Sequence, residues 1–322
     1  MKIALIGPGI MPIPPNNWGA VEILIWDQYE YLTKKGHDVT IINTPDLKLV
    51  AEHVNAENYD FIHLHYDDHA KILCNLIKKP FCTTTHYGYI KEHHPNYPGW
   101  KHIYDGVLKS PGIISLSPEI KNLFLKSGYS GFLKHLRNGA RTKEFRFTEE
   151  PSKFGLCLGK VEPRKRQRDL SNICYEKVKI DFIGPVIDPF FKENITCKHA
   201  GVWSKPDLYK NLTDYRCLVL LSDGEAAPLV VPEALSAGLS VVVSKTAAAN
   251  LDTTKPFIYV VDGTLDETAA GVISKAIDEN DKYRKEIRDY AEKYFDWDVI
   301  CDEYIQIVKE FINENSLCNN SN

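Results

Sequence analysis

Short apolar runs alternate with longer amphipathic segments along the whole chain. Such alternation is typical of strands and crossover helices that build a parallel sheet. We therefore predict that residues 1–150 form a Rossmann-like, doubly wound α/β domain. Its predicted strands are KIALIG (2–7), DVTIIN (38–43), DFIHLH (60–65), PFCTTTH (80–86) and GIISLS (112–117).

A second series of the same kind follows a polar segment, FRFTEEPSK (145–153), which has no periodicity and is the predicted linker. We predict a second Rossmann-like domain over residues 151–296, facing the first across a cleft. Residues 297–322 are then a terminal crossover segment after a break at YFDWD. The strands of this second series are FGLCLGKV (154–161), KIDFIG (179–184), RCLVLLS (216–222), LSVVVS (239–244) and FIYVVD (257–262).

Two helices have clear signals at their ends. Apolar positions at helical spacing run through AVEILIWDQYEYLTKKG and stop at Gly36, a residue suited to a helix C-terminus. In SPEIKNLFLKSG, Ser117 is the predicted N-cap, Pro118 takes the first helical position and Gly128 closes the helix.

Composition narrows the class of protein. A length of 322 residues favours two cores, and 43% hydrophobic with 25% charged residues is ordinary for a globular protein. A net charge of -4 argues against nucleic acid as a partner. The eight cysteines form no CxxC pair, which favours reduced thiols and a cytoplasmic protein. We expect no membrane-spanning segment, and we expect the chain to open on a buried strand instead of a leader.

Ligands of open parallel sheets collect beyond the carboxyl ends of the strands. The first predicted strand is followed there by GPGIMPIPPNNWGAVE, in which Gly19 stands at the mouth of the first helix and lets an anionic group approach the backbone. A nicotinamide-dependent oxidoreductase requires GxGxxG at this place, and the chain has Pro12 and Pro14 after Gly7 and Gly9.

Two carboxylates bracket a loop in LSDGEAAPLVVPEALSAGLSVVVS. Glu233 is suited to accept two hydrogen bonds from a vicinal diol such as ribose, and Glu225 to hold hydroxyls of a sugar. The alternative interpretation of Glu233 is a charge in the first helical turn, stabilised by the helix dipole.

Basic residues cluster in LGKVEPRKRQRDL, directly after the first strand of the second series. Lys160 and Lys165 flank a turn at Pro163 and can neutralise a diphosphate, so that no metal is needed. The alternative is a solvated helix face. The basic positions of this segment are 160, 164, 165, 166 and 168.

Together these segments resemble the family 4 retaining glycosyltransferases of the GT-B fold, over nearly the whole chain. The resemblance implies a terminal helix that returns to the first domain, a nucleotide-sugar donor, and an acceptor that is a glycan, a lipid-linked saccharide or a small molecule. It assigns Glu225 to the transferred sugar, Glu233 to the ribose, and Lys160 and Lys165 to the diphosphate. Lys165, Glu225 and His86 of TTTHYGY are the implied catalytic residues.

The same resemblance extends to weaker positions. Further donor contacts are implied for Gly19, Ile183, Gly184 and Val202 and for the backbone N–H groups of Leu229 and Val230; the acceptor side is implied for Asn17, Glu22, Tyr87 and Asn138. Three positions depart from the family pattern: Lys160 stands where Arg is common, Arg166 where Gly is common, and Pro228 replaces a Gly whose N–H often touches the ligand.

Other functions stay open at this point. A nucleotide-sugar epimerase or a catalytically silent nucleotide-sugar binder can share this architecture. The HLHYDDH cluster holds enough ligands for a metal, but strand alternation favours a histidine pair, His63 and His65, on one face of a strand. The loop HYGYIKEHHPNYPGW is the predicted acceptor-side loop, with a plain surface loop as the alternative. The basic run from Lys134 to Arg146 is a candidate for peripheral contact with anionic lipid, with a solvated surface as the alternative.

Overall fold

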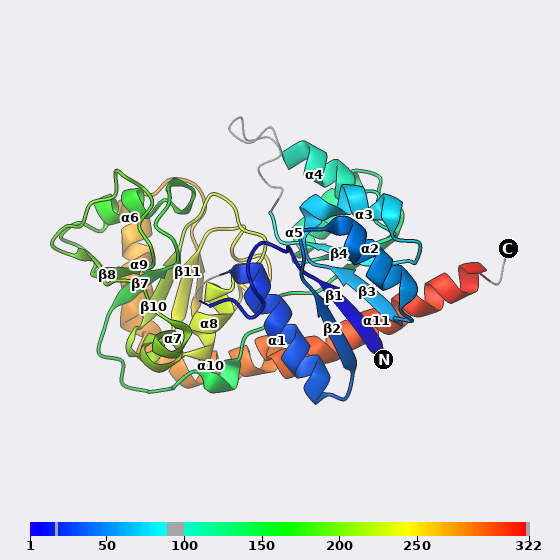
Figure 1. Cartoon of the computed structure of the whole chain (residues 1–322). Helices are drawn as coiled ribbons and strands as arrows, with labels where there is room; N and C mark the ends of the chain where they lie inside the picture. Colours follow the sequence, from blue (N-terminus) through cyan, green and yellow to red (C-terminus); the bar gives the residue numbers. More distant parts are fainter. Residues whose placement is uncertain (17–18, 89–99, 320–322) are drawn as a thin grey trace. The chain divides into compact units, whose positions relative to one another are not determined.

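The chain forms two compact units in a computed structural model that describes residues 1–16, 19–88 and 100–319. The first unit contains Met1–Asn138 together with Trp297–Asn322, and the second contains Gly139–Asp296. Each unit holds one parallel sheet of six described strands with helices around it (Figure 1).

The first sheet has the order β2-β1-β3-β4-β5-β6, with every neighbouring pair parallel. The order reverses between β1 and β3, so the carboxyl ends of these two strands flank the topological switch point, where open α/β sheets bind ligands. The strands are β1 (Lys2–Ile6), β2 (Asp38–Ile42), β3 (Phe61–Leu64), β4 (Cys82–Thr85), β5 (Gly112–Ser115) and β6 (Phe132–His135).

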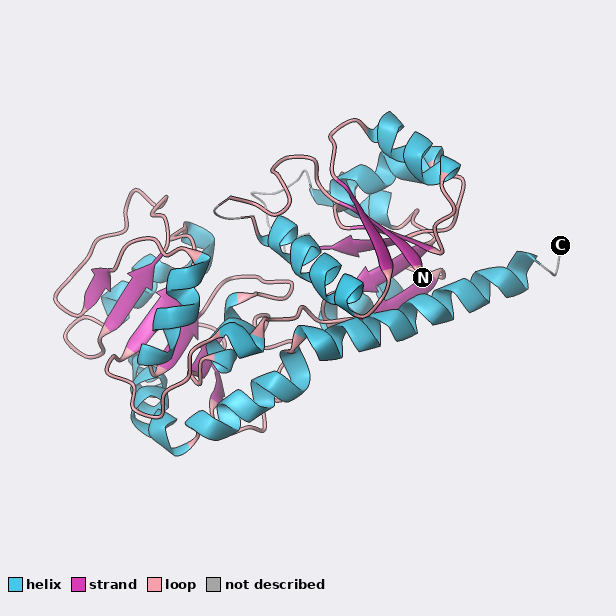
Figure 2. Ribbon diagram, turned by 60° about the horizontal axis from the view of Figure 1, so that its bottom comes forward, coloured by secondary structure: helices cyan, strands magenta, loops and turns pink. Residues whose placement is uncertain are grey.

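The helices of the first unit begin and end close to the predicted signals. Ser117 caps α5, its side chain accepting a hydrogen bond from the backbone N–H of Ile120, and Pro118 takes the first helical position. Figure 2 shows the strands lying between helices. The helices are α1 (Ala20–Lys34), α2 (Leu47–Ala56), a 3-10 turn at Asp67–His69, α3 (Ala70–Leu76), α4 (Trp100–Val107), α5 (Pro118–Lys126) and α11 (Trp297–Asn319).

Helix α11 returns to the first unit, as the resemblance implied. It packs against α1, where Trp297 Nε1 donates to Asp27 Oδ2 at 3.2 Å, and the Tyr304 ring meets Phe61 of β3 edge to face. Arg137 makes two hydrogen bonds with Glu303, at 2.8 and 2.9 Å.

The candidate lipid-binding run from Lys134 to Arg146 is largely occupied by ion pairs inside the protein. Lys134 pairs with Glu310 and Arg137 with Glu303, both carboxylates belonging to α11. Arg141, Lys143 and Arg146 also have carboxylate partners. These cations thus take part in ion pairs within the protein, and contact of the run with anionic lipid stays a prediction.

The second sheet has the order β12-β11-β10-β7-β8-β9 and is also parallel throughout. Its order reverses between β7 and β10, which places the switch point at the carboxyl ends of those two strands. The strands are β7 (Gly155–Leu158), β8 (Ile180–Ile183), β9 (Cys197–His199), β10 (Cys217–Leu220), β11 (Ser240–Val243) and β12 (Ile258–Val260).

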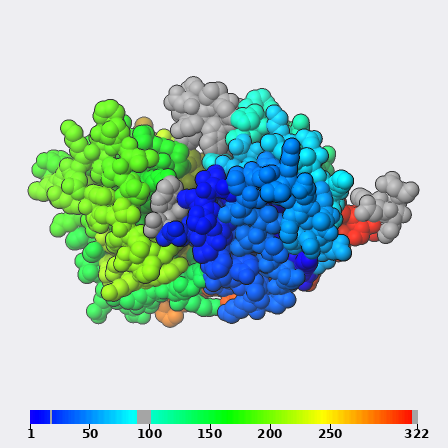
Figure 3. Space-filling model, viewed as in Figure 1, coloured from blue at the N-terminus to red at the C-terminus, as the bar shows by residue number. Residues whose placement is uncertain are grey.

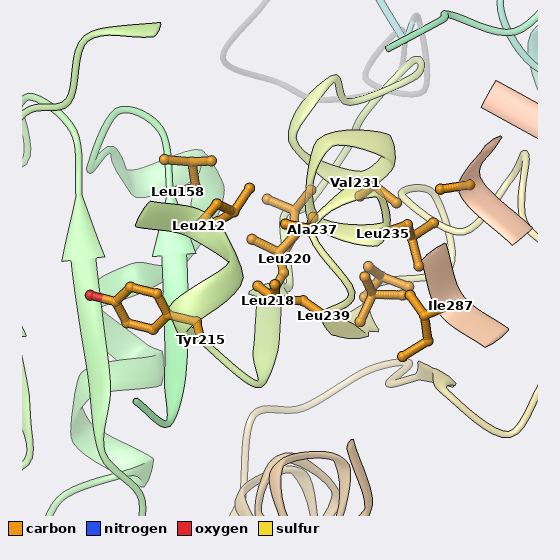
Figure 4. Packing of buried hydrophobic residues seen from close by; sticks show 14 of the residues in the cluster. Leu158, Leu212, Tyr215, Leu218, Leu220, Val231, Leu235, Ala237, Leu239 and Ile287 are labelled. Carbon is orange, nitrogen blue, oxygen red and sulfur yellow. The ribbon is translucent and has the colours of Figure 1, made fainter. Parts of the chain in front are cut away.

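An apolar core lies between this sheet and its helices. Leu218 and Leu220 of β10 pack with Val231 and Leu235 of α8 and with Ile287 of α10, as Figure 4 shows. The elements are 3-10 turns at Thr142–Glu144, Pro163–Lys165, Leu212–Asp214 and Asn280–Lys282 and the helices α6 (Gln167–Ile173), α7 (Lys205–Asn211), α8 (Val230–Ser236), α9 (Glu267–Glu279) and α10 (Arg284–Phe295).

The chain enters the second unit at residue 139, earlier than the predicted division at residue 150. The N–H of Ala140 donates to the carbonyl of Phe295 at 2.7 Å, so the outgoing and returning passages of the chain lie side by side. The predicted linker is also packed: Phe145 is buried and Arg146 N–H donates to Tyr209 O at 2.9 Å.

Arg284 of α10 fixes this entry segment from within the core. Its guanidinium is buried and donates to the carbonyl oxygens of Thr148 at 2.7 Å, Tyr215 at 3.0 Å and Thr213 at 2.7 Å. Burial lowers the pKa of Arg284 to about 10. These bonds tie the start of the unit to a helix near its end.

Two strands of the structure were not predicted, β6 and β9. Both are edge strands of their sheets, and both carry polar residues: Lys134 and His135 in β6, Lys198 and His199 in β9. An edge strand is covered less completely than a central one, so it needs no continuous apolar run.

The described cysteines are reduced, as predicted from the sequence. The seven cysteines with described side chains are free thiols, and all except Cys74 are buried. No described helix is both long and apolar enough to cross a bilayer. In the space-filling view of Figure 3, the visible face of the first unit is formed by the early part of the chain, coloured blue to cyan.

Candidate functional site

Two glycines bring the ends of β7 and β8 close together in the second unit. Gly159 and Gly184 have φ angles of 119° and 136°, which side chains of L-residues disfavour. The N–H of Gly159 donates to Ile183 O at 2.8 Å, and a Cβ on Gly184 would lie 2.3 Å from Gly159 O. The ends of β7 and β8 therefore carry two positions without a side chain, where another group can approach the backbone.

Lys165 folds back over this opening. Its Nζ lies 2.7 Å from the place a Cβ of Gly159 would take, so the missing side chain is what admits the ammonium group. Burial lowers the pKa of Lys165, and the nearby Glu225 carboxylate acts in the opposite direction. The sequence placed Lys165 at this strand end, and the structure adds its approach to the glycine backbone.

Arg164 links the two sequence motifs of the second unit. Its guanidinium donates to Glu162 Oε1 at 2.7 Å and to Glu225 Oε1 at 3.1 Å, while Asp223 N–H donates to its carbonyl at 2.9 Å. The loop after β7 is thereby joined to the loop after β10, the two strands that flank the switch point. Sequence reasoning counted Arg164 among the basic positions suited to a diphosphate but did not predict its contact with Glu225.

Buried Gln167 holds the loop that carries Lys160. Its amide donates to Lys160 O at 2.8 Å and accepts from Glu162 N–H at 3.1 Å. The preceding residue, Arg166, has φ 56° and ψ 24°, the left-handed conformation that favours glycine. Arg166 thus adopts a conformation that Gly takes without strain, at the position where the resemblance implies Gly.

The two carboxylates of the acidic motif have different partners. Glu225 lies in the loop after β10 and pairs with Arg164, whereas Glu233 lies in α8 and pairs with Lys205 of α7. Glu233 is 7% exposed. It is thus a buried carboxylate with its own cation, and it also lies in the first turn of α8, as the alternative interpretation predicted. Lys205 was missed by sequence reasoning.

The other residues of the second unit predicted to contact the nucleotide-sugar donor lie at this edge of the sheet or at the start of α8. Ile183 accepts from Gly159, and the N–H of Gly184 donates to Gly201 O at 2.8 Å, so these backbone groups already take part in the fold. Val202 is 65% exposed. Helix α8 begins at Val230 with Leu229 as its N-cap, which makes their N–H groups part of the open first turn.

In the first unit, the glycine loop is held by side chains. Asn43 at the end of β2 accepts from Gly9 N–H at 2.7 Å and donates to Met11 O at 2.8 Å. Gly19 has φ 146°, and its missing Cβ makes room for the buried Glu22 carboxylate, whose Oε2 lies 2.7 Å from that place. The predicted acceptor-side residue Asn17 lies outside the described residues, as does residue range 89–99 of the predicted acceptor loop.

Three imidazoles gather at the carboxyl ends of β3 and β4. The ring centroids of His63 and His65 are 3.9 Å apart and those of His65 and His86 are 5.7 Å apart. Burial lowers the pKa of His63 to about 3 and of His86 to about 4, and it lowers that of His65 as well. All three are therefore neutral at physiological pH.

Their hydrogen bonding differs. His63 contacts the Tyr304 hydroxyl at 3.1 Å and Thr84 Oγ1 at 2.8 Å. Both ring nitrogens of His65 and Nε2 of His86 are buried without a partner among the described residues. Among those residues, no group of three or more histidine, cysteine, aspartate or glutamate side chains is arranged to hold a metal ion.

The other predicted positions of the first unit lie nearby or at its end. Tyr87 follows His86, and burial raises the pKa of its hydroxyl to about 12. Its backbone N–H donates to Thr85 Oγ1 at 3.3 Å, and that hydroxyl donates to the buried Asp67 at 2.7 Å. Asn138 is the last residue of the unit before the chain crosses.

Comparison with known proteins relates part of the chain to one family. Residues 192–294 match the family model for glycosyl transferases group 1. No curated protein matches the sequence.

Solved structures resemble nearly the whole chain. Sucrose-phosphate synthase from Thermosynechococcus elongatus superposes with a TM-score of 0.77 at 16% identity, covering 97% of this chain and 99% of that one. HepE from Anabaena, solved in complex with UDP-glucose, gives a TM-score of 0.74 at 14% identity, covering 96% and 100%.

A third structure, AviGT4, a glycosyltransferase involved in avilamycin A biosynthesis, gives 0.72 at 14% identity, covering 97% and 98%. The chain therefore has the GT-B glycosyltransferase fold predicted from its sequence, and the part that matches the glycosyl transferases group 1 family lies in its second unit.

Proposed function

We propose that this protein transfers a sugar from a nucleoside-diphosphate sugar to an acceptor hydroxyl, with retention of configuration and without a metal. The observation that carries the proposal is the Lys165, Arg164 and Glu225 cluster at the switch point of the second sheet. It joins the basic loop after β7 to the carboxylate of the loop after β10 in a chain of this fold. HepE, which has the same fold, was solved with UDP and with UDP-glucose.

The proposed chemistry assigns one task to each charged group. Lys165 and Lys160 neutralise the diphosphate as the bond between the anomeric carbon and its oxygen breaks. Glu225 holds hydroxyls of the sugar, and Glu233 accepts hydrogen bonds from the ribose diol. The acceptor oxygen then bonds to the anomeric carbon on the same face and loses its proton to a phosphate oxygen of the departing nucleoside diphosphate.

No protein nucleophile is needed for this route. A double displacement through Glu225 would instead form a covalent sugar adduct, which a slow fluorinated donor would trap. Mass spectrometry of the intact chain after such treatment distinguishes the two routes, because only the double displacement adds the mass of the sugar.

The test is a thermal-shift and turnover screen of the full chain with UDP-, GDP-, ADP- and dTDP-sugars, each with and without chelator. We expect stabilisation by one donor and slow hydrolysis that the chelator does not change. Glu233→Gln weakens donor binding and Glu225→Gln mainly lowers turnover. Negligible effects of both changes would contradict the roles proposed for Glu233 and Glu225.

The same screen separates the alternatives. An epimerase converts the donor into another nucleotide sugar without modifying any acceptor, and a silent binding protein is stabilised without any turnover. A shift with NAD instead of a nucleotide sugar would contradict the whole proposal.

A further inference from the structure

The ion pair between Lys205 and Glu233 joins two helices of the second unit. Lys205 is the first residue of α7 and Glu233 lies in α8, and Lys205 Nζ contacts Glu233 Oε1. The lysine side chain is 31% exposed and the glutamate side chain 10%. The carboxylate is therefore largely shielded from water, and its cation comes from another element.

The start of α7 fixes the position of this lysine. Ser204 and Asp207 form a capping box, in which the Ser204 hydroxyl accepts from Asp207 N–H at 3.3 Å and Asp207 Oδ2 accepts from Ser204 N–H at 3.2 Å. Pro206 stands in the first turn. The ammonium group also lies 6.0 Å from the centre of the Tyr209 ring. Lys205 is thus held at its backbone and lies near an aromatic side chain.

The second oxygen of the carboxylate is differently placed. Within the described residues, Oε2 of Glu233 takes part in no hydrogen bond and is not among the fully buried unpaired atoms. A carboxylate offers about four lone-pair sites. Oε1 can therefore keep Lys205 while Oε2, and the second lone pair of Oε1, accept from a ligand.

We propose that Lys205 is a positioning residue, which holds the Glu233 carboxylate through Oε1 so that Oε2 faces the vicinal diol of the donor ribose. This inference rests on the proposed function. Without its cation, a shielded carboxylate loses the interaction that offsets its desolvation and fixes its orientation. Removing Lys205 then weakens nucleotide binding, whereas a lysine that merely competes with ribose would strengthen binding when removed.

The experiment measures the dissociation constants of UDP, GDP and ADP, each beside its 2′-deoxy counterpart, for the full chain. The variants are Lys205→Met, Lys205→Gln, Lys205→Arg, Glu233→Gln and the double change of Lys205→Met with Glu233→Gln. Lys210→Met, an exposed lysine of the same helix, is the matched control. Thermal unfolding of each variant checks folding, and the two neutral replacements of Lys205 guard against one of them failing to fold.

We expect Lys205→Met and Lys205→Gln to weaken the ribonucleotide by about tenfold, which corresponds to about 1.4 kcal/mol. Lys205→Arg should bind the ribonucleotide about as well as the unaltered chain. The affinity for the 2′-deoxy nucleotide should fall by a smaller factor than that for the ribonucleotide when Lys205 is replaced by Met or Gln. The double variant should bind no more weakly than Glu233→Gln alone. The donor KM rises while kcat changes little.

Tighter or unchanged binding after loss of Lys205 overturns this inference alone, provided that the unaltered chain binds a nucleotide. Additive losses in the double variant overturn it too, because Lys205 then acts independently of Glu233. If the unaltered chain binds none of the nucleotides, both the inference and the proposed function fail.

Discussion

The carboxyl edges of the two sheets differ in their polar side chains. In the second unit, Arg164 and Lys205 each contact a carboxylate, and Lys165 lies against glycine backbone. In the first unit, the imidazoles of His63 and His65 are buried and neutral. Both edges are switch points of parallel six-stranded sheets. The two edges therefore correspond in topology and differ in the side chains that lie there, with ion pairs in the second unit and a group of neutral imidazoles in the first.

Lowering the pH should destabilise the first unit more than the second, and we expect this to be the largest difference between them. In the folded chain the pKa values of His63 and His86 are about 3 and about 4, below the value of about 6.5 in an unfolded chain. The unfolded state therefore binds more protons below pH 6.5, and the first unit loses about 1.4 kcal/mol of stability per histidine for each pH unit down to about 4.

Hydrogen exchange at pH 7, 6 and 5, followed by mass spectrometry of peptides from each unit, measures this loss. Peptides of β3 and β4 should lose protection before those of β7 and β10 do. Equal loss in both units would show that the histidines are not the cause.

Lys165→Met tests the charged edge. Removing one preorganised group that stabilises developing charge typically costs about 10²- to 10³-fold in kcat, and we expect a loss of this size in donor turnover. Lys177→Met is the control, because Lys177 pairs with the highly exposed Glu267 at the surface. A loss below about threefold would remove Lys165 from the proposed mechanism.

Leucine in place of each buried histidine tests the neutral edge. His63→Leu removes the partner of the buried Thr84 hydroxyl and should cost about 1 to 3 kcal/mol in the free energy of unfolding. His65→Leu removes ring nitrogens that have no partner among the described residues, so the cost should be smaller. Urea titration of both variants gives the two values, and the reverse order would contradict the hydrogen bonding described for this edge.

Gly159→Ala has the smallest expected effect. A Cβ there meets Lys165 Nζ at 2.7 Å and the backbone has φ 119°, so we expect a loss of about 1 kcal/mol in stability with weaker donor binding. Gly271→Ala in α9 is the matched control, since nothing lies within 4 Å of its added Cβ. Unchanged binding with Gly159→Ala would show that Lys165 does not depend on this opening.

Much of the fold follows from local pattern. Buried central strands such as β1 and β10 are continuous apolar runs, and Ser117 and Pro118 mark the start of α5 in the sequence itself. The edge strands β6 and β9 lack that pattern because neighbours cover them less. The early entry into the second unit is accompanied by a hydrogen bond between Ala140 and Phe295, which are distant in the chain, so no local pattern marks it.

The candidate site also contains residues that the sequence predicts and partners that it does not. Lys160, Lys165, Glu225 and Glu233 stand at strand and helix ends that the sequence marks, so they were predicted together. The partners of the carboxylates were not, because the contacts of Arg164 with Glu225 and of Lys205 with Glu233 join segments far apart along the chain. No local spacing records such pairs. The roles of these residues, and those of His86 and Tyr87, remain predictions.

The interrupted course of the first unit has a consequence for its biosynthesis. The second unit is one continuous stretch, Gly139–Asp296, and it can fold as soon as that stretch has left the ribosome. The first unit is completed only by α11, which is made after the second unit and brings Tyr304 against Phe61 and His63. A nascent chain therefore leaves Phe61 and His63 of β3 without this cover until the part of α11 around Tyr304 has left the ribosome.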